Sequence, residues 1–247
     1  MQKLQRREGP GIGFGAAIRE QPRAMLLAAL ATSAAEFDAA LKAGADAVLL
    51  ESAPDAAVTL LGKLAIDKAC VGVMTDSLDE AAAAALAAAG CDFVISTLEG
   101  TESTAVDTER MGHILVADEG AEDNTLRALA PLGLDALYVK RKAGGMMLAH
   151  QLGLLRLASF SSTPLLVPVD ASASVAELRV LRDSGVGGVV APRTATPEEL
   201  KQLIETLKAV PAPKKSRRDG GDMAIVPSPA ASKANDDEDD DHGDDDD

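Results

Sequence analysis

The sequence predicts an α/β protein in which eight parallel strands alternate with helices and close into a small barrel. One phrase, a glycine closely followed by a short apolar run, occurs four times, and each copy follows a helical pattern. Four further apolar runs lie between the copies, so that strand starts fall about 20 to 30 residues apart. Uninterrupted apolar runs are typical of strands buried on both faces. Eight such strands are enough to close a parallel sheet without edges.

The repeated phrase predicts a helix end, a tight turn and then a strand. Its glycine suits the left-handed conformation that ends many helices. The copies are Gly44-Ala-Asp46-Ala-Val-Leu-Leu, Gly90-Cys-Asp92-Phe-Val-Ile-Ser, Gly133-Leu-Asp135-Ala-Leu-Tyr-Val and Gly185-Val-Gly187-Gly-Val-Val-Ala. The intervening strands are predicted at Leu26 to Ala31, Cys70 to Met74, His113 to Ala117 and Pro164 to Val169.

Each predicted strand is followed by a helix candidate with a start signal, typically Ser, Thr, Asp or Pro. In chain order, the helices are predicted after Ser33, at Pro54-Asp55, after Ser77, over Glu102 to Arg110, after Asp123-Asn124, over Met146 to Phe160, after Ser174, and after Thr196-Pro197. A leucine-rich solenoid has a similar period, but its Leu-x-x-Leu-x-Leu motif is absent. An open doubly wound sheet stays as the alternative, although no glycine-rich turn follows the first strand.

Composition and charge limit the classes of function. The chain has 247 residues, of which 47% are hydrophobic, and its net charge of −15 argues against binding to nucleic acid or to anionic membranes. No apolar run reaches the roughly 20 residues that span a bilayer. Cys70 and Cys91 are too few for a disulfide framework and are expected to fill the core. Together with the lack of a clear export signal, this predicts a cytoplasmic protein.

The predicted barrel occupies residues 25–210 and is flanked by two segments of different composition. Residues 1–24 contain Gly-Pro-Gly-Ile-Gly-Phe-Gly, which lacks the strand and the Lys-Ser/Thr ending of a phosphate loop, so an N-terminal arm is expected. Residues 211–247 are first rich in Lys and Arg and then in Asp, which predicts a disordered acidic tail. This tail is a candidate site for a protein partner. Because the loops of so small a barrel must be short, a homo-oligomer could supply walls to its pocket.

The alternating pattern resembles the TIM-barrel (βα)₈ superfamily, and within it the aldolase-type barrels. The resemblance implies an active site at the carboxyl ends of the strands. Lys140, at the end of the sixth strand, resembles in strand position the Schiff-base lysine of class I aldolases. The reaction needs an uncharged amine, which burial and the neighbouring cations Arg141 and Lys142 favour. The other predicted catalytic residues are carboxylates that could move protons, namely Glu51, Asp118 and Asp170.

Two further kinds of site are considered at the same end of the barrel. Arg141 and Arg193, with Gly144 and Gly145 before the sixth helix, are predicted to bind a carboxylate or phosphate. Against a phosphate-sugar enzyme, the glycine-rich loops after strands seven and eight are missing. No resident cofactor or metal is predicted. Magnesium stays open as an alternative, with oxygen ligands from Glu51, Asp118, Glu119 and Asp170.

The sequence therefore predicts a carbon–carbon lyase of the aldolase type that acts on a small anionic carbonyl or carboxylate substrate. The alternative is a barrel without catalysis, which binds a partner through its N-terminal arm and acidic tail. Scarce histidine and short loops favour that alternative. Fold by itself does not decide between the two.

Overall fold

The structure is a computed structural model of the chain, and it describes residues 23–66, 69–141 and 145–212. Almost all of the predicted N-terminal arm and of the predicted acidic tail lies outside the described residues. So do Lys142 and Gly144, which were considered for the lysine environment and the anion site.

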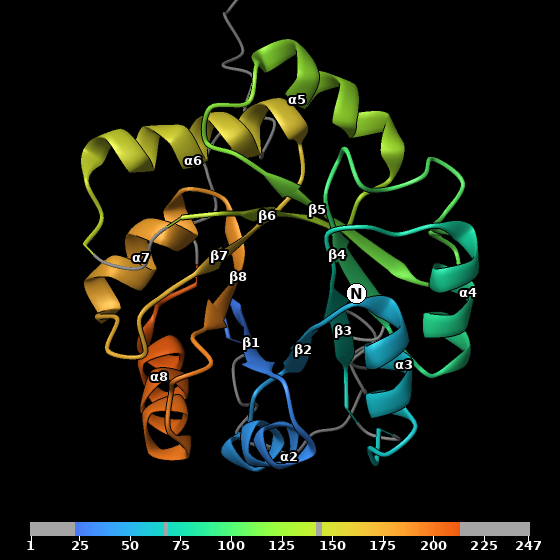
Figure 1. The fold of residues 1–247 in the computed structure, drawn as a ribbon. Coiled ribbons are helices and arrows are strands. Elements are labelled where there is room, and N and C mark those ends of the chain that lie inside the picture. The colour runs from blue at the N-terminus through green and yellow to red at the C-terminus, as the bar shows by residue number, and fades with distance from the viewer. Residues whose placement is uncertain (1–22, 67–68, 142–144, 213–247) are drawn as a thin grey trace, which may run out of the picture. The chain divides into compact units, whose positions relative to one another are not determined.

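Eight parallel strands form a closed barrel in chain order, and the first strand pairs with the eighth (Figure 1). The prediction of a closed barrel is therefore confirmed, and the open-sheet alternative is wrong. The strands are β1 (Leu26–Ala31), β2 (Ala47–Glu51), β3 (Val71–Met74), β4 (Phe93–Ser96), β5 (Gly112–Ala117), β6 (Ala136–Val139), β7 (Leu165–Pro168) and β8 (Val186–Ala191).

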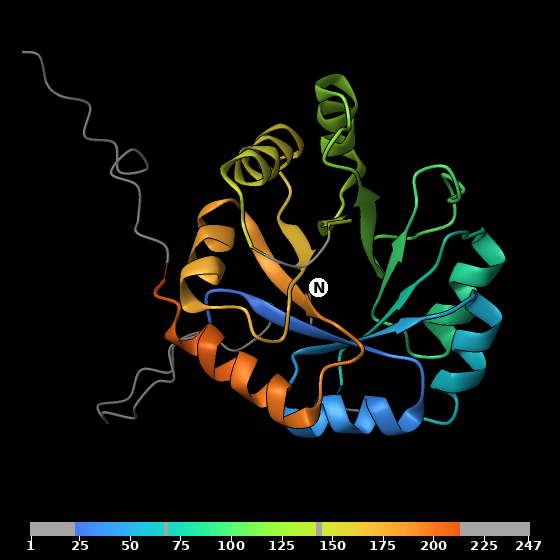
Figure 2. The ribbon, with the colours of Figure 1, turned by 60° about the vertical axis from the view of Figure 1, so that its left-hand side comes forward.

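The helices lie around the outside of the barrel, as Figures 1 and 2 show. None of the described helices is both long and apolar enough to cross a membrane. They are α2 (Ala34–Ala43), α3 (Pro54–Leu61), α4 (Glu80–Ala88), α5 (Asp123–Leu129) with the 3₁₀ turn η1 (Ala130–Leu132), α6 (Leu148–Ser161), α7 (Val175–Asp183) and α8 (Pro197–Ala209).

The glycines of the repeated phrase adopt the predicted left-handed conformation. The φ angle is +99° at Gly44, +92° at Gly90, +66° at Gly133 and +88° at Gly185. A side chain strains the backbone in this region, which explains why glycine stands at each of these turns.

The aspartate of the phrase links each of three strand pairs at the amino-terminal end of the barrel. Its carboxylate accepts a hydrogen bond from the backbone N–H of the preceding strand: Leu27 donates to Asp46 at 2.9 Å, Val71 to Asp92 at 3.0 Å, and His113 to Asp135 at 3.0 Å. The fourth copy has Gly187 instead, and the register between β7 and β8 shifts at that point. The aspartates thus accept hydrogen bonds from backbone N–H groups at the start of the strands.

We expect Asp92→Ala to lower the free energy of unfolding by about 1–3 kcal/mol, because the buried Val71 N–H loses its acceptor. Urea denaturation measures this loss. Asp38→Ala, at an exposed position of α2, is the control and should stay within about 0.5 kcal/mol of the wild type. Equal stabilities of the two variants would contradict the structural role of the repeated aspartate.

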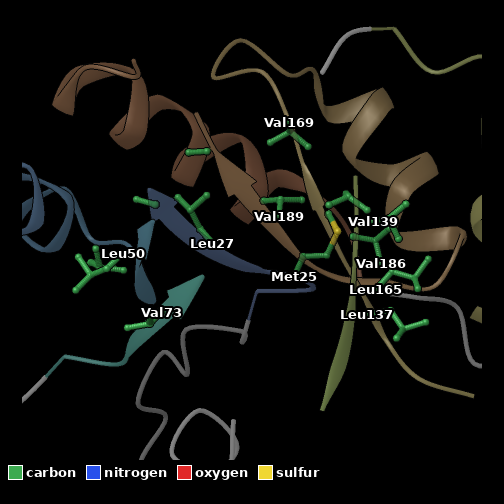
Figure 3. Close-up of a cluster of buried hydrophobic side chains, with 14 of the residues drawn as sticks. Met25, Leu27, Leu50, Val73, Leu137, Val139, Leu165, Val169, Val186 and Val189 are labelled. Carbon is green, nitrogen blue, oxygen red and sulfur yellow. The ribbon is translucent and has the colours of Figure 1, made fainter. Parts of the chain in front are cut away.

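Alternation along the strands creates two apolar layers. One side of each strand faces the helices and belongs to a large layer that includes Leu27, Leu50 and Val189 (Figure 3). The opposite side faces the barrel interior, which holds a smaller cluster containing Leu49, Phe93 and Tyr138 among others. The side chains of this second series point toward the barrel axis, and the series continues along each strand to the mouth of the barrel.

Both cysteines pack in these layers, as predicted. Cys70 belongs to the interior cluster and Cys91 to the outer layer, and neither forms a disulfide. Burial raises the pKa of Cys91 to about 12, and its thiol lies 3.0 Å from the Phe93 carbonyl oxygen. Such a thiol is unreactive at neutral pH.

Several helix starts are confirmed and two are displaced. Ser33, Ser174 and Thr196 cap α2, α7 and α8, each accepting a backbone N–H bond, and Thr196 forms a full capping box. The start signal predicted at Ser77 is displaced, because α4 begins at Glu80 with Asp79 as its cap. Asp123 lies inside α5 rather than before it.

The helix predicted over Glu102 to Arg110 is absent: this fully described segment forms turns instead. Its sequence has few apolar residues, so it offers no helical stripe to bury. It covers the barrel with Ala105, which is 5% exposed, while the segment before it pairs with the β3–α4 loop through a bridge between Leu78 and Thr101. Tertiary contacts therefore replace a helix between β4 and β5.

Candidate functional site

Two of the predicted catalytic residues lie at the mouth of the barrel on opposite strands. Glu51 continues the inward-facing series of β2, after Leu49, and Lys140 continues that of β6, after Tyr138. Strands β2 and β6 are four places apart in a ring of eight, so they face each other across the barrel. The alternation along both strands therefore directs the two side chains into the mouth.

Glu51 and Lys140 line one cavity of about 360 Å³ at the carboxyl ends of the strands. This volume lies near the lower end of the range for small-molecule sites. The wall between the two residues comes from the β2–α3 turn and the β3–α4 loop. The other lining residues are Ser52, Ala53, Pro54, Met74, Thr75, Asp76 and Ser77.

Asp76 brings a second carboxylate to the cavity. It follows the inward-facing positions Gly72 and Met74 of β3, two residues beyond the strand end. Asp76 is not among the residues predicted for the site, because β3 lacks the repeated phrase and its aspartate. The same alternation applied to β3 identifies it.

The loop that carries Asp76 is held by β4 and the turn after it. Thr97 Oγ1 donates to the Asp76 carbonyl oxygen at 2.7 Å, and the Leu78 N–H donates to the Gly100 carbonyl oxygen at 2.8 Å. Thr75 Oγ1 donates to the Ser77 carbonyl oxygen at 3.0 Å. These bonds position the Asp76 side of the cavity.

Tyr138 lies one layer below Lys140 on the same side of β6 and is 9% exposed. Burial raises the pKa of Tyr138, and the Glu51 carboxylate adds to the increase. The phenol is therefore neutral and close enough to Glu51 to respond to its charge. It lies between the apolar interior and the polar mouth.

The other two predicted catalytic carboxylates, Asp118 and Asp170, are at the mouth but outside this cavity. They are exposed and follow the inward-facing series of β5 and β7. The charge of Asp170 contributes to the pKa of Glu177, at the start of α7. Burial raises the pKa of Glu177, Arg141 opposes this change and Asp170 adds to it. The described structure therefore brings Glu51 and Lys140 together, but not all four residues.

The two arginines predicted to bind an anion lie outside this cavity. The Arg141 guanidinium lies 3.9 Å from the Glu177 carboxylate. The pKa of Glu36 is lowered mainly by the hydrogen bond from the Thr32 backbone. The charge of Arg193 lowers it further, to a smaller extent. Gly145 is exposed before α6, and Gly144 lies outside the described residues. Neither arginine lines the cavity of Glu51 and Lys140.

No three His, Cys, Asp or Glu side chains among the described residues form a group that could hold a metal ion. The carboxylates of the magnesium alternative, Glu51, Asp118, Glu119 and Asp170, therefore do not assemble into such a group. Lys140 itself is exposed, so the burial that the sequence analysis expected for it is not found.

His113 lies at the amino-terminal part of β5, on the side that faces away from the interior. Its Nε2 is 2.9 Å from Oγ of Ser96, which is fully buried. Burial lowers the pKa of His113, and Asp135 opposes the change. The pair belongs to the packing between β4, β5 and the turns that cover them, not to the cavity.

The depressed pKa of His113 makes the fold sensitive to acid. Because the unfolded chain binds the proton more readily, the free energy of unfolding should fall as the pH drops below about 6.5. Urea denaturation at pH 5, 6 and 7 should show a weaker decrease for His113→Gln than for the wild type. His150→Gln, at an exposed position of α6, is the control and should show the same decrease as the wild type. An equally weak decrease in both variants would contradict the assignment of the acid sensitivity to His113.

The closed ring of parallel strands with outer helices makes this chain a TIM barrel. No protein-family model and no curated protein matches its sequence. Solved structures match its fold. Tryptophan synthase of Mycobacterium tuberculosis aligns with a TM-score of 0.60 and 16% identity over 76% of this chain and 92% of that one. A mutant tryptophan synthase α-subunit of Pyrococcus furiosus aligns with a TM-score of 0.59 and 15% identity, over 75% of this chain and 98% of that one. A protein of Aquifex aeolicus VF5 aligns with a TM-score of 0.57 and 12% identity, over 77% of this chain and 95% of that one. At these identities the likeness concerns the fold.

Proposed function

We propose that this barrel is a carbon–carbon lyase of the aldolase type, in which Lys140 forms an imine with a small carbonyl substrate. The observation that carries the proposal is the shared cavity of Lys140 and Glu51 at the carboxyl ends of opposite strands. This end of a TIM barrel is where active sites lie. A primary amine facing a carboxylate supplies the nucleophile and the proton carrier that imine chemistry requires.

The proposed reaction uses groups that line the cavity. The uncharged amine of Lys140 adds to the substrate carbonyl carbon, and loss of water leaves an iminium ion. The carboxylate of Glu51 or Asp76 then takes the proton from the hydroxyl group on the carbon β to the iminium carbon. The bond between the α and β carbons breaks, which releases an aldehyde and leaves an enamine on Lys140. Protonation of the enamine and hydrolysis of the iminium ion return the free lysine and the second carbonyl product.

The predicted anionic substrate depended on Arg141 and Arg193. The Arg141 guanidinium lies 3.9 Å from the Glu177 carboxylate, and neither arginine lines the cavity. The imine proposal does not depend on these arginines. It depends on Lys140 being reachable from solvent, and Lys140 is exposed.

Borohydride reduction tests the proposal directly. The full chain is incubated with a small aldehyde or ketone, reduced, digested and analysed by peptide mass spectrometry. We expect the reduced adduct on the peptide that contains Lys140, at a rate above that of exposed lysines such as Lys42. Modification of Lys140 no faster than of Lys42, for every carbonyl compound tried, would overturn the proposal and favour the binding alternative.

A further inference from the structure

The charges around Lys140 bear on the kind of carbonyl compound that it would accept. Among the described residues that line the cavity, the charged groups are the carboxylates of Glu51 and Asp76 and the ammonium of Lys140. Conversion of Lys140 to an iminium ion leaves its positive charge in place. The lining therefore carries a net negative charge both before and after the proposed covalent step.

The surroundings of the cavity extend this negative charge. The neighbouring hollow at the starts of α3 and α4 is lined by Asp55, Asp79 and Glu102. The guanidinium of Arg141 is next to Glu177. A carboxylate or phosphate on the substrate would meet like charges at short range, where the repulsion is only partly reduced by solvent.

The same lining is suited to hydroxyl groups. Ionised carboxylates accept hydrogen bonds only, so Glu51 and Asp76 can accept from substrate hydroxyls without needing a second cation. Ser52 Oγ is buried and has no hydrogen-bond partner among the described residues, and Ser77 also lines the cavity. Met74 and Pro54 add apolar surface against which a carbon chain can pack.

We infer that the substrate is a short, uncharged hydroxy-aldehyde or hydroxy-ketone rather than a keto acid or a sugar phosphate. The inference rests on the proposed function, because it assigns the substrate class of the imine-forming lysine. Lys140 takes the carbonyl carbon, and Glu51 and Asp76 accept hydrogen bonds from the hydroxyl groups beside it. The cavity volume of about 360 Å³ sets the small size.

Two matched pairs of carbonyl compounds test the inference by borohydride trapping on the full chain. Dihydroxyacetone is compared with dihydroxyacetone phosphate, and hydroxyacetone with pyruvate. Each rate at Lys140 is divided by the rate with free Nα-acetyl-lysine, which removes the intrinsic reactivity of the compound. We expect the uncharged member of each pair to react at least about tenfold faster, and added salt to reduce the difference because it screens the repulsion.

A charge variant assigns the discrimination to the cavity. Asp76→Asn should reduce the preference for dihydroxyacetone over its phosphate several-fold. Asp38→Asn changes the net charge of the chain equally, but Asp38 lies on α2 and does not line the cavity, so its ratio should match the wild type. Equal changes in the two variants would overturn the role of the cavity.

The outcomes separate the two proposals. A Lys140 adduct that forms equally well or faster with the anionic member of each pair would overturn the uncharged substrate and leave the imine chemistry standing. The absence of a Lys140 adduct with all four compounds would overturn the imine chemistry itself. An adduct that forms mainly with the uncharged members supports both.

Discussion

Lys140→Met should lower proton exchange at the α-carbon of the substrate by at least about a thousandfold. Without the amine there is no iminium ion and hence no enamine to exchange its proton. The exchange is followed in D₂O by proton NMR, with whichever of dihydroxyacetone, hydroxyacetone or pyruvate forms an adduct with the wild type. Methionine keeps the length and the apolar stem of lysine, so the fold should stay intact.

Glu51→Gln separates adduct formation from proton transfer. The imine should still form, whereas α-proton exchange should fall by about 10²–10⁴-fold if Glu51 is the base that moves the α-proton, because the amide cannot take up a proton. Exchange at the wild-type rate would assign this proton transfer to Asp76. Lys42→Met, on the exposed side of α2, is the matched control for Lys140 and should exchange as the wild type does. Wild-type exchange in Lys140→Met would assign the reaction to another group.

Gly100→Ala should destabilise the protein by about 3 kcal/mol and impair the cavity as well. A Cβ at Gly100 would overlap the Asp76 carbonyl oxygen and lie 2.7 Å from Thr97 Oγ1. Overpacking against backbone cannot be relieved by rotating a side chain, so the expected cost is at the upper end of the usual range. The loop that carries Asp76 must then move. Urea denaturation measures the stability, and borohydride trapping at Lys140 reports the state of the cavity.

Gly120→Ala is the matched control for this substitution. Gly120 is exposed, and no atom lies within 4 Å of a Cβ built there. The free energy of unfolding of the Gly120→Ala variant should differ from that of the wild type by less than about 1 kcal/mol, and trapping at Lys140 should be unaffected. Equal stability of the two variants would show that the Gly100 turn does not hold the Asp76 loop.

The sequence predicts correctly those features of the fold that depend on one short segment of the chain. The four glycines end helices in a left-handed conformation whatever surrounds them, and Ser33, Ser174 and Thr196 cap helices with their own side chains. Alternation within a strand likewise puts Glu51 on the same side as Leu49, and Lys140 on the same side as Tyr138. These features depend on backbone geometry over a few residues, so they can be predicted from the sequence.

The parts that failed depend on contacts between distant segments. The stretch from Glu102 to Arg110 has local helix signals, but its neighbouring turn gains backbone bonds to the β3–α4 loop instead. Arg141 and Arg193 follow strand ends, as an anion site would require, yet Arg141 lies beside Glu177 of α7, and the charge of Arg193 lowers the pKa of Glu36 of α2. No signal in either arginine's own segment indicates these carboxylates.

The sequence by itself determined that eight strands and their turns repeat, and which residues of a strand share one side, because these depend on glycine conformation and on the two-residue period of a strand. Only the tertiary structure decided which strand-end side chains share a cavity. Closure of the ring places β2 opposite β6 and brings Asp76 beside them, whereas Asp118 and Asp170 remain outside. The physical reason is that a cavity is a property of side-chain packing between segments that are far apart in the chain.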